Sequence, residues 1–351
     1  MRTNVLKRFG RKGLAVSCMT TLIVLAASLS IALAAPAKPT VWRMDYVLPA
    51  GDPETVMLQQ ACDDIFTFTE GRLKIDVYPS FSLKLNPARQ LANIRDGLME
   101  AACIQVQMVE GQDPSLSVVE APGVWATKED QAKAVDALNP FKTKLYAEQY
   151  SSQFVATKMM TVQINGIFSN RPLNSLADLK GLKVRVPSRR QLVGLQTLGA
   201  APQTMVSGEV YMALKTGVLD ATSSGTRSLI YQKWGEVVKY GLEGNVAEAV
   251  AQDIVINKKA WDAISPDIQE IVTMVFSALA AKQRVMAVMP GMSNHWKRQV
   301  EAMGVKVNTM THAEQIKMED LFAEEWYKDL EKANPRTKEA WEIVRPFTRP
   351  R

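Results

Sequence analysis

From residue 41 onward, short segments with a hydrophobic residue at every second position alternate with longer segments in which hydrophobic residues recur every three or four positions. The first pattern, in 41–49 (VWRMDYVLP) and 71–79 (GRLKIDVYP), predicts strands. The second predicts helices over 52–69 and over 87–97 (PARQLANIRDG), the latter ending at its final glycine. A further strand is expected over 98–106 (LMEAACIQV). This β-α-β-α-β order favours an α/β fold with a mostly parallel sheet and helices on its faces.

Two segments of this region resemble later segments in the same order. GRLKIDVYPS (71–80) is similar to GLKVRVPS (181–188), and ANIRDGLMEAA (92–102) is similar to MALKTGVLDAT (212–222). The second match includes a glycine at the helix end, followed by an acidic residue and alanine. We therefore predict two similarly built α/β lobes, in which Arg185 occupies the position of Asp76 in the first lobe.

Two apolar segments, 158–173 and 249–261, are placed to cross between the lobes as hinge strands. Two lobes joined by more than one crossing enclose a cleft, which is where a ligand would bind. Long helices are predicted over 266–302, with an interruption at Pro290-Gly291, and over 311–332. The predicted boundaries are 39–162 with 251–290 for lobe I and 163–250 with 291–340 for lobe II, the long helical region bridging both.

The first 34 residues have the three parts of a secretory signal peptide. Basic residues are followed by an apolar run from Leu14 to Leu33, and Ala32-Leu33-Ala34 supplies a cleavage site with small residues. The alternative is an uncleaved anchor, because the run approaches the length that spans a bilayer. Either reading predicts that the rest of the chain is exported.

The chain carries a formal net charge of +6, which could indicate an acidic partner. Five basic residues, however, lie in the first dozen positions without an acid; removing them from the 42 leaves 37 basic against 36 acidic side chains. An almost neutral mature protein argues against nucleic-acid binding through a basic surface.

The sequence carries little that predicts catalysis or a metal site. Neither a dinucleotide-binding GxGxxG after a strand nor a phosphate-binding GxxxxGK[ST] occurs. GMSNH (291–295) places a serine near a histidine, but it lacks the second glycine of a nucleophile elbow and lies in helical sequence. Beyond the signal, two cysteines (Cys62 and Cys103) and two histidines do not make a usual Cys/His metal site, and their spacing leaves open whether the cysteines pair. We therefore expect no enzyme activity, no cofactor and no metal ligands.

Arg185 is the candidate binding residue. In the strand LKVRV, Leu182, Val184 and Val186 face one way and Arg185 the other, near the carboxyl end where α/β proteins bind ligands. A guanidinium there suits a planar carboxylate of a ligand. The alternative is an ion pair within the protein, with Asp178 or Asp220.

The segments NRPLNSLADLKGLKVRVPS (170–188) and LGAAPQTMVSGEVYMALKTGVLDA (198–221) closely resemble the substrate-binding proteins of TRAP (tripartite ATP-independent periplasmic) transporters, the DctP-type solute receptors. That family shows a DLKG-x-K-x-R-x-P motif, then LGA-x-P and EVY-x-AL-x-x-G-x-x-D-G. The resemblance extends over essentially the mature chain and implies a two-lobe periplasmic binding protein with hinge strands and long C-terminal helices.

The resemblance also implies roles for individual residues. Arg185 matches the family's carboxylate-pairing arginine, and Asn165 stands where some relatives have a second arginine, which argues against sialic-acid-like chemistry. Ser224, with Ser223 beside it, aligns with a ligand-contacting position. Further cleft candidates, for which core packing (the tryptophans) or a surface position (the arginine) is the alternative, are Gln105, Gln107, Trp125, Arg227 and Trp234.

The function that the resemblance implies is a periplasmic receptor that closes on an organic acid, a monocarboxylate or a dicarboxylate, and delivers it to the integral membrane subunits of a TRAP transporter. We expect a monomer and leave a dimer open. The alternatives are a ligand sensor for a signalling partner and an exported enzyme on the same frame.

Overall fold

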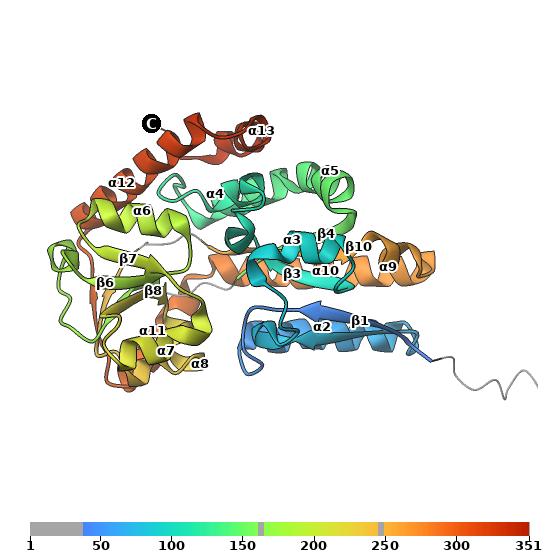
Figure 1. Ribbon diagram of the computed structural model, residues 1–351, viewed down its shortest axis with the longest axis horizontal. Coiled ribbons are helices and arrows are strands. Elements are labelled where there is room, and N and C mark those ends of the chain that lie inside the picture. The colour runs from blue at the N-terminus through green and yellow to red at the C-terminus, as the bar shows by residue number, and fades with distance from the viewer. Residues whose placement is uncertain (1–37, 161–164, 245–248, 351) are drawn as a thin grey trace, which may run out of the picture. The chain divides into compact units, whose positions relative to one another are not determined.

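The computed structural model describes residues 38–160, 165–244 and 249–350. The chain divides into two compact units, Met1–Thr40 and Val41–Arg351. The expected signal peptide lies outside the described residues and stays a prediction. The fold described below is that of the second unit (Figure 1).

The first sheet has the strand order β2-β1-β3-β10-β4. β1 is parallel to β3, whereas β10 runs antiparallel to both of its neighbours, β3 and β4. Residues alternate as the sequence predicts: Trp42 and Met44 of β1 are buried in one hydrophobic cluster, while Arg43 between them binds Glu100 at the surface. The strands are β1 (Thr40–Asp45), β2 (Leu73–Tyr78), β3 (Ala101–Gln105), β4 (Ser152–Met159) and β10 (Ala251–Asn257).

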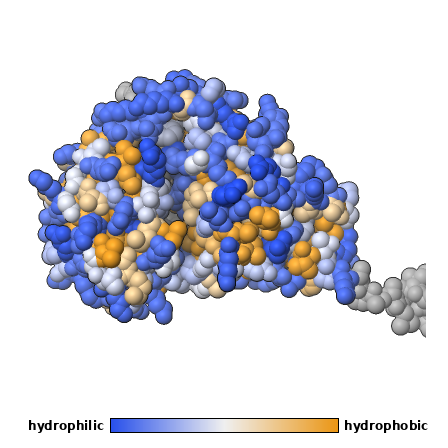
Figure 2. Space-filling view, in the orientation of Figure 1, coloured by the Kyte–Doolittle hydropathy of each residue, from blue (hydrophilic) through white to orange (hydrophobic). Residues whose placement is uncertain are grey.

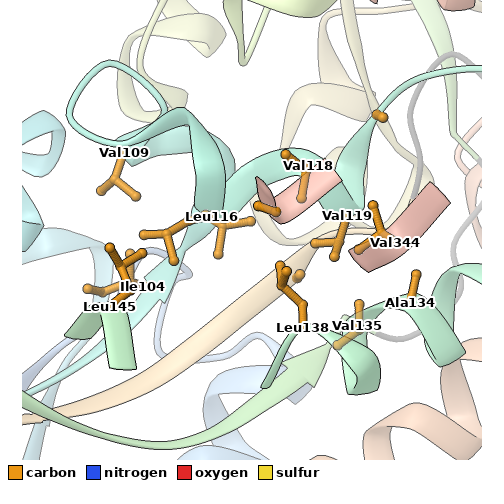
Figure 3. Packing of buried hydrophobic residues seen from close by; sticks show 14 of the residues in the cluster. Ile104, Val109, Leu116, Val118, Val119, Ala134, Val135, Leu138, Leu145 and Val344 are labelled. Carbon is orange, nitrogen blue, oxygen red and sulfur yellow. The ribbon is translucent and has the colours of Figure 1, made fainter. Parts of the chain in front are cut away.

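Helices cover both faces of this sheet. Residues of α2 (Pro53–Phe68) and α10 (Pro266–Val288) form one core with β1. The opposite face, part of which Figure 3 shows, packs against α3 (Gln90–Arg95), α4 (Lys128–Ala137), α5 (Asn139–Tyr150), the short helices η3 (Val106–Val109) and η4 (Pro114–Glu120), and α13 (Pro335–Val344). By length and composition α10 could cross a membrane, yet it lays a face of buried residues on the core of this sheet.

The second sheet has the order β11-β9-β5-β8-β6-β7. β6 is parallel to β7 and β8, and β5 runs antiparallel to β8 and β9. β5 and β10, which lie within the two predicted crossing segments 158–173 and 249–261, are thus antiparallel to their neighbours, which makes both sheets mixed. The strands are β5 (Asn165–Ser169), β6 (Lys183–Val186), β7 (Ala201–Thr204), β8 (Ala221–Gly225), β9 (Tyr240–Glu243) and β11 (Lys306–Thr309).

The face of β6 that carries Leu182, Val184 and Val186 packs against α6 (Arg189–Thr197) and α12 (His312–Glu331), as the alternation predicts. The other face packs against α7 (Ser207–Lys215), α8 (Thr226–Tyr231), the short helix η6 (Trp234–Glu236) and α11 (Pro290–Ala302). Figure 1 shows α12 beside α6 and, beyond it, α13 beside α4. The helical C-terminal region therefore packs on both sheets.

Smaller helical segments complete the unit: η1 (Pro79–Phe81), η2 (Pro87–Arg89), η5 (Leu176–Leu179), α9 (Lys258–Asp262) and η7 (Arg345–Phe347). On the face shown in Figure 2, hydrophobic residues are interspersed with hydrophilic ones, as is usual for a surface in water. The expected crossing 158–173 includes 161–164, outside the described residues, so the lobe boundary placed at 162/163 stays a prediction.

The internal repeat is present, but one of the two sequence matches has the wrong partner. β6 lies between β7 and β8, as β1 lies between β2 and β3. The lobe I counterpart of β6 is therefore β1, whereas the sequence match had paired β6 with β2. That match was misleading because short Lys/Val strands before Pro and Ser recur without common descent. The second match is consistent with the topology: Gly97 and Gly217 both have positive φ, 73° and 76°, at the ends of α3 and α7.

The strand register gives the corrected counterpart of Arg185. Met44 and Asp45 of β1 lie opposite Ala101 and Ala102 of β3. Val184 and Arg185 of β6 lie opposite Ala221 and Thr222 of β8. Because Ala101 and Ala221 match in the repeat, the residue equivalent to Arg185 is Asp45, and not Asp76.

Candidate functional site

Three of the expected site residues lie at one edge of the second sheet. Arg185 is near the carboxyl end of β6, and Ser224 is near the carboxyl end of the parallel strand β8. Asn165 begins the antiparallel strand β5 and lies opposite Gly225, at the same edge. Carboxyl ends of parallel strands are the usual ligand-binding edge of such sheets.

Arg185 is buried, with 5% of its surface exposed. Its Nε donates to the backbone oxygen of Met205 at 2.9 Å, and Nη2 lies 3.5 Å from Oγ of Ser207. Its guanidinium carbon is 5.7 Å from the ring centre of Trp234. Burial lowers the pKa of Arg185 to about 10, because the charged form is withdrawn from water.

Neither expected carboxylate pairs with Arg185. Asp178 accepts backbone N–H groups of Asn174 and Ser175, where it belongs to a capping box. Asp220 accepts the backbone N–H of Lys183 and lies 3.5 Å from Arg171. Arg185 therefore has no ion pair with any residue that the structure describes.

The other buried cations of the described chain differ from Arg185 in this respect. Lys142 pairs with Asp253 at 2.7 Å, and Lys158 pairs with Glu54 at 3.3 Å. Arg227 pairs with Glu54 at 3.1 Å and with Asp52 at 3.3 Å. Buried charges are normally compensated by an opposite charge. Arg185 is thus the exception, and it is placed where a ligand would bind.

The neighbours of Arg185 in lobe II have mixed roles. Trp234 is 1% exposed and belongs to a hydrophobic cluster, which bears out core packing, while its ring also lies under the Arg185 guanidinium. Oγ of Ser223 donates to Oε1 of Gln191 at 2.7 Å, so this hydroxyl supports α6. Ser224 and Asn165 are only partly buried.

Arg227 is not a surface residue, contrary to the alternative considered from the sequence. It is 2% exposed and reaches from α8 to the start of α2, where Asp52 caps the helix and Glu54 lies in its first turn. Glu54 also accepts from Lys158 and Gln283. Arg227 therefore connects the elements of the two sheets.

Arg190 makes a second connection of this kind, which sequence reasoning missed. It lies in the first turn of α6, and its Nε donates to Glu110 at 2.7 Å. Its two terminal nitrogens donate to the backbone oxygen and Oγ of Ser117 at 2.7 and 2.8 Å. Its guanidinium carbon lies 4.2 Å from the ring centre of Trp326. The available signal was the pair Arg189-Arg190 directly after the strand that carries Arg185.

These two connections join equivalent edges. Arg227 follows β8 and contacts the segment after β1, while Arg190 follows β6 and contacts segments after β3. The carboxyl ends of the parallel strands in the two sheets therefore lie on facing sides of the junction. This is the expected position of a ligand cleft.

On the lobe I side, Gln105 ends β3 opposite Gln252 of β10 and is partly buried. Gln107 lies in η3 and is also partly buried. Trp125 is 7% exposed and packs in the core cluster of this sheet, next to Thr348. The structure thus places Gln105 and Gln107 at the edge and Trp125 in the core.

Asp45, the counterpart of Arg185, is fully buried at the end of β1. Burial raises the pKa of Asp45 to about 6, although backbone amides of Leu83 and Tyr46 act in the opposite direction. Leu83 follows β2 as Met205 follows β7, so each charged side chain lies beside the segment that follows the neighbouring strand. Ion pairs of the described chain do not include Asp45. Sequence reasoning missed Asp45, because an acidic residue at an alternate position of β1 looks like the exposed position of an ordinary strand.

Groups of three or more His, Cys, Asp or Glu side chains that could hold a metal ion do not occur among the described residues. Cys62 and Cys103 are both free and buried, which answers the question that their spacing left open.

Comparisons with known proteins agree with this architecture. The model of the DctP family, described as bacterial extracellular solute-binding protein, family 7, matches residues 44–333. The chain is 27% identical over 266 residues to the C4-dicarboxylate-binding periplasmic protein DctP of Rhodobacter capsulatus, covering 70% of this chain and 74% of that one.

Solved structures have the same fold. A Bordetella pertussis extracytoplasmic solute receptor, DctP7, which binds pyroglutamic acid, superposes with a TM-score of 0.78 at 20% identity and covers 87% of this chain and 99% of its own. A TRAP periplasmic solute-binding protein of Ralstonia eutropha with bound (S)-2-acetolactate has a TM-score of 0.74 at 22% identity, with the same coverage.

Proposed function

Because the chain belongs to the bacterial extracellular solute-binding proteins of family 7, the DctP family of TRAP receptors, we propose that it binds a small organic acid through Arg185. Membership confirms the predicted fold and the expectation of a solute receptor instead of an enzyme. The identity of the solute is specific to each receptor, so it has to come from the residues of this chain.

The observation that carries the proposal is the uncompensated charge of Arg185. Three of the four buried cationic side chains in the described residues have a carboxylate partner within 3.3 Å, and Arg185 has none. A bidentate carboxylate is the natural complement of a guanidinium. A ligand carboxylate would therefore compensate the charge that the protein leaves uncompensated.

Around Arg185 we propose Asn165 and Ser224 from lobe II and Gln105 and Gln107 from lobe I as polar ligand contacts. They are partly buried at the facing edges of the two sheets. Trp234 supports the guanidinium from its ring face. For Ser223, Arg227 and Trp125 the contacts described above favour supporting roles, in α6, in the connection between the sheets and in the core.

As partners we propose the integral membrane subunits of a TRAP transporter, to which the closed receptor delivers its ligand. The family is extracytoplasmic, and we propose export to the periplasm with removal of residues 1–34. We propose a monomer as the functional state, with a dimer as the alternative.

The test is a thermal-shift screen of organic acids on the mature protein and on Arg185→Met. At least one acid should raise the melting temperature of the wild type and leave the variant unchanged. Mass spectrometry of small molecules released from the purified protein by denaturation should recover the same class of acid. An acid that stabilises both proteins equally would refute the role of Arg185.

A further inference from the structure

We infer that the ligand is a monocarboxylate that also carries an N–H donor group, neutral or cationic, and that Asp45 receives this group while Arg185 holds the carboxylate. This inference rests on the proposed function and narrows its ligand from organic acids in general. It requires three things of the structure: a site for one carboxylate, a site for one donor, and the lack of a cation for a second carboxylate.

Arg185 provides the carboxylate site. Its Nε is occupied by Met205, and one terminal nitrogen is 3.5 Å from Ser207, which is a weak contact at the limit of hydrogen bonding. The guanidinium has five N–H donors in a planar fork, so most of its donor capacity is available to a ligand.

Asp45 provides the donor site. The repeat places it where lobe II has Arg185, in the same strand position and beside an equivalent loop. It is fully buried, and the charged partners that other buried acids have, such as Lys142 for Asp253, are not found for it in the described chain. A buried carboxylate of this kind needs hydrogen-bond donors and repels another carboxylate.

The other buried or partly buried cations that connect the two sheets are already neutralised by the protein, and Arg189 beside them is exposed to solvent. Arg227 is held by Asp52 and Glu54, and Arg190 is held by Glu110. Lys158 is shared between Glu54 and the hydroxyl of Tyr46, at 3.3 and 3.1 Å. The internal segments 161–164 and 245–248 contain neither lysine nor arginine. Inside the buried part of the junction, a second ligand carboxylate would therefore have to displace a protein carboxylate from its partner.

Together these charges define a site with one cation from lobe II and one anion from lobe I. A ligand with a carboxylate at one end and an N–H donor at the other neutralises both. A dicarboxylate would compensate Arg185 but bring a like charge to Asp45, which costs affinity.

The test is a matched set of four-carbon acids that differ only at the second end: succinate, its monoamide succinamate, 4-aminobutanoate and butanoate. A ring series, with pyroglutamate, proline and cyclopentanecarboxylate, covers ligands of another shape. Dissociation constants are measured by calorimetry on the wild type, Asp45→Asn and the control Asp76→Asn. Asp76 is a partly exposed carboxylate paired with Lys74 in β2, at the position that the sequence match had assigned.

We expect donor-bearing acids to bind the wild type at least about tenfold more tightly than succinate, since close like charges cost several kcal/mol. Asp45→Asn should reduce this ratio to within about threefold by strengthening succinate and weakening 4-aminobutanoate, whereas Asp76→Asn should preserve it. Succinate binding the wild type as tightly as succinamate, or an unchanged ratio in Asp45→Asn, would overturn the inference and leave the proposed function intact. Failure of every acid to bind, or equal binding by Arg185→Met, would instead overturn the proposed function.

Discussion

Replacing Arg185 with methionine is expected to stabilise the ligand-free protein and to remove its response to organic acids. The two effects have one cause, because the uncompensated charge that makes Arg185 the proposed binding group also makes it costly to bury. A core residue of purely structural importance would behave in the opposite way, since its loss lowers the stability of the free protein.

The magnitude follows from the surroundings of Arg185. Burial lowers its pKa from 12.5 to about 10, which corresponds to about 3 kcal/mol against the charged form in the folded state. Methionine fills a similar volume without the charge, but it leaves the backbone oxygen of Met205 without its donor, at a cost of about 1 kcal/mol. The contact with Trp234 is worth about another 0.5–1 kcal/mol. The net gain is therefore about 1–2 kcal/mol, or about 1.5–3 °C in melting temperature for a chain of this length.

The assay is differential scanning calorimetry of the ligand-free mature protein, after unfolding and refolding to remove bound ligand. In the wild type, ligand at about one hundred times its dissociation constant adds about 2.7 kcal/mol, and in Arg185→Met this increment should vanish. Lys183→Met is the matched control, because Lys183 lies two residues away on the same face of the same strand but is exposed to solvent. A ligand-free Arg185→Met that melts below the wild type, with Lys183→Met unchanged, would refute the reasoning.

Three further predictions concern other buried groups. Arg227→Met should lower the free energy of unfolding by about 3–5 kcal/mol in guanidinium titrations, because Asp52 and Glu54 lose a buried partner. Adding Glu54→Gln to this variant should recover part of the lost stability, and a loss below about 1 kcal/mol in Arg227→Met would contradict the prediction. The pKa of Asp45 is raised from 3.8 to about 6, so the stability that its protonated form contributes is complete below pH 3.8 and is lost as the pH rises to about 6. Between these pH values, the free energy of unfolding of the wild type should fall by about 2–3 kcal/mol more than that of Asp45→Asn. Parallel curves for the two proteins would exclude the effect. Burial raises the pKa of the Cys103 thiol to about 12 and that of Cys62 further. Neither thiol should therefore react with Ellman's reagent before the protein unfolds. Prompt labelling of the native protein would show that one of them is accessible.

Most of the fold could be predicted from the sequence because its signals are local. Alternation identifies β1 and β6, helical spacing identifies α2 and α10, and the glycines at 97 and 217 end their helices with positive φ. Strand pairing is not local. The likeness of 71–80 to 181–188 therefore matched β6 with β2, although hydrogen bonding places β6 as the counterpart of β1.

The candidate site likewise contains residues that a local sequence pattern reveals and contacts that it does not. Arg185 could be found from the sequence because it lies on the face opposite the apolar residues of a strand, close to the ligand-binding edge where that strand ends. Asp45 carries the same kind of signal, yet on β1 an acidic residue at an alternate position looks like an ordinary exposed one. The partners of Arg190 and Arg227 lie more than seventy residues away, so no local pattern reveals that Glu110 and Glu54 neutralise them.

The equivalence of Asp45 and Arg185 bears on how such receptors diversify. Each residue stands at the end of a strand in its own sheet, supported by its own loop, and neither contributes to the ion pairs of Arg190 or Arg227 that join the sheets. At the site proposed here, a substitution at one position is therefore expected to change the recognition of one end of the ligand and to leave the other end and the junction as they were. Opposite charges at equivalent positions of two similarly built lobes thus give the proposed site two ends that can be adjusted independently.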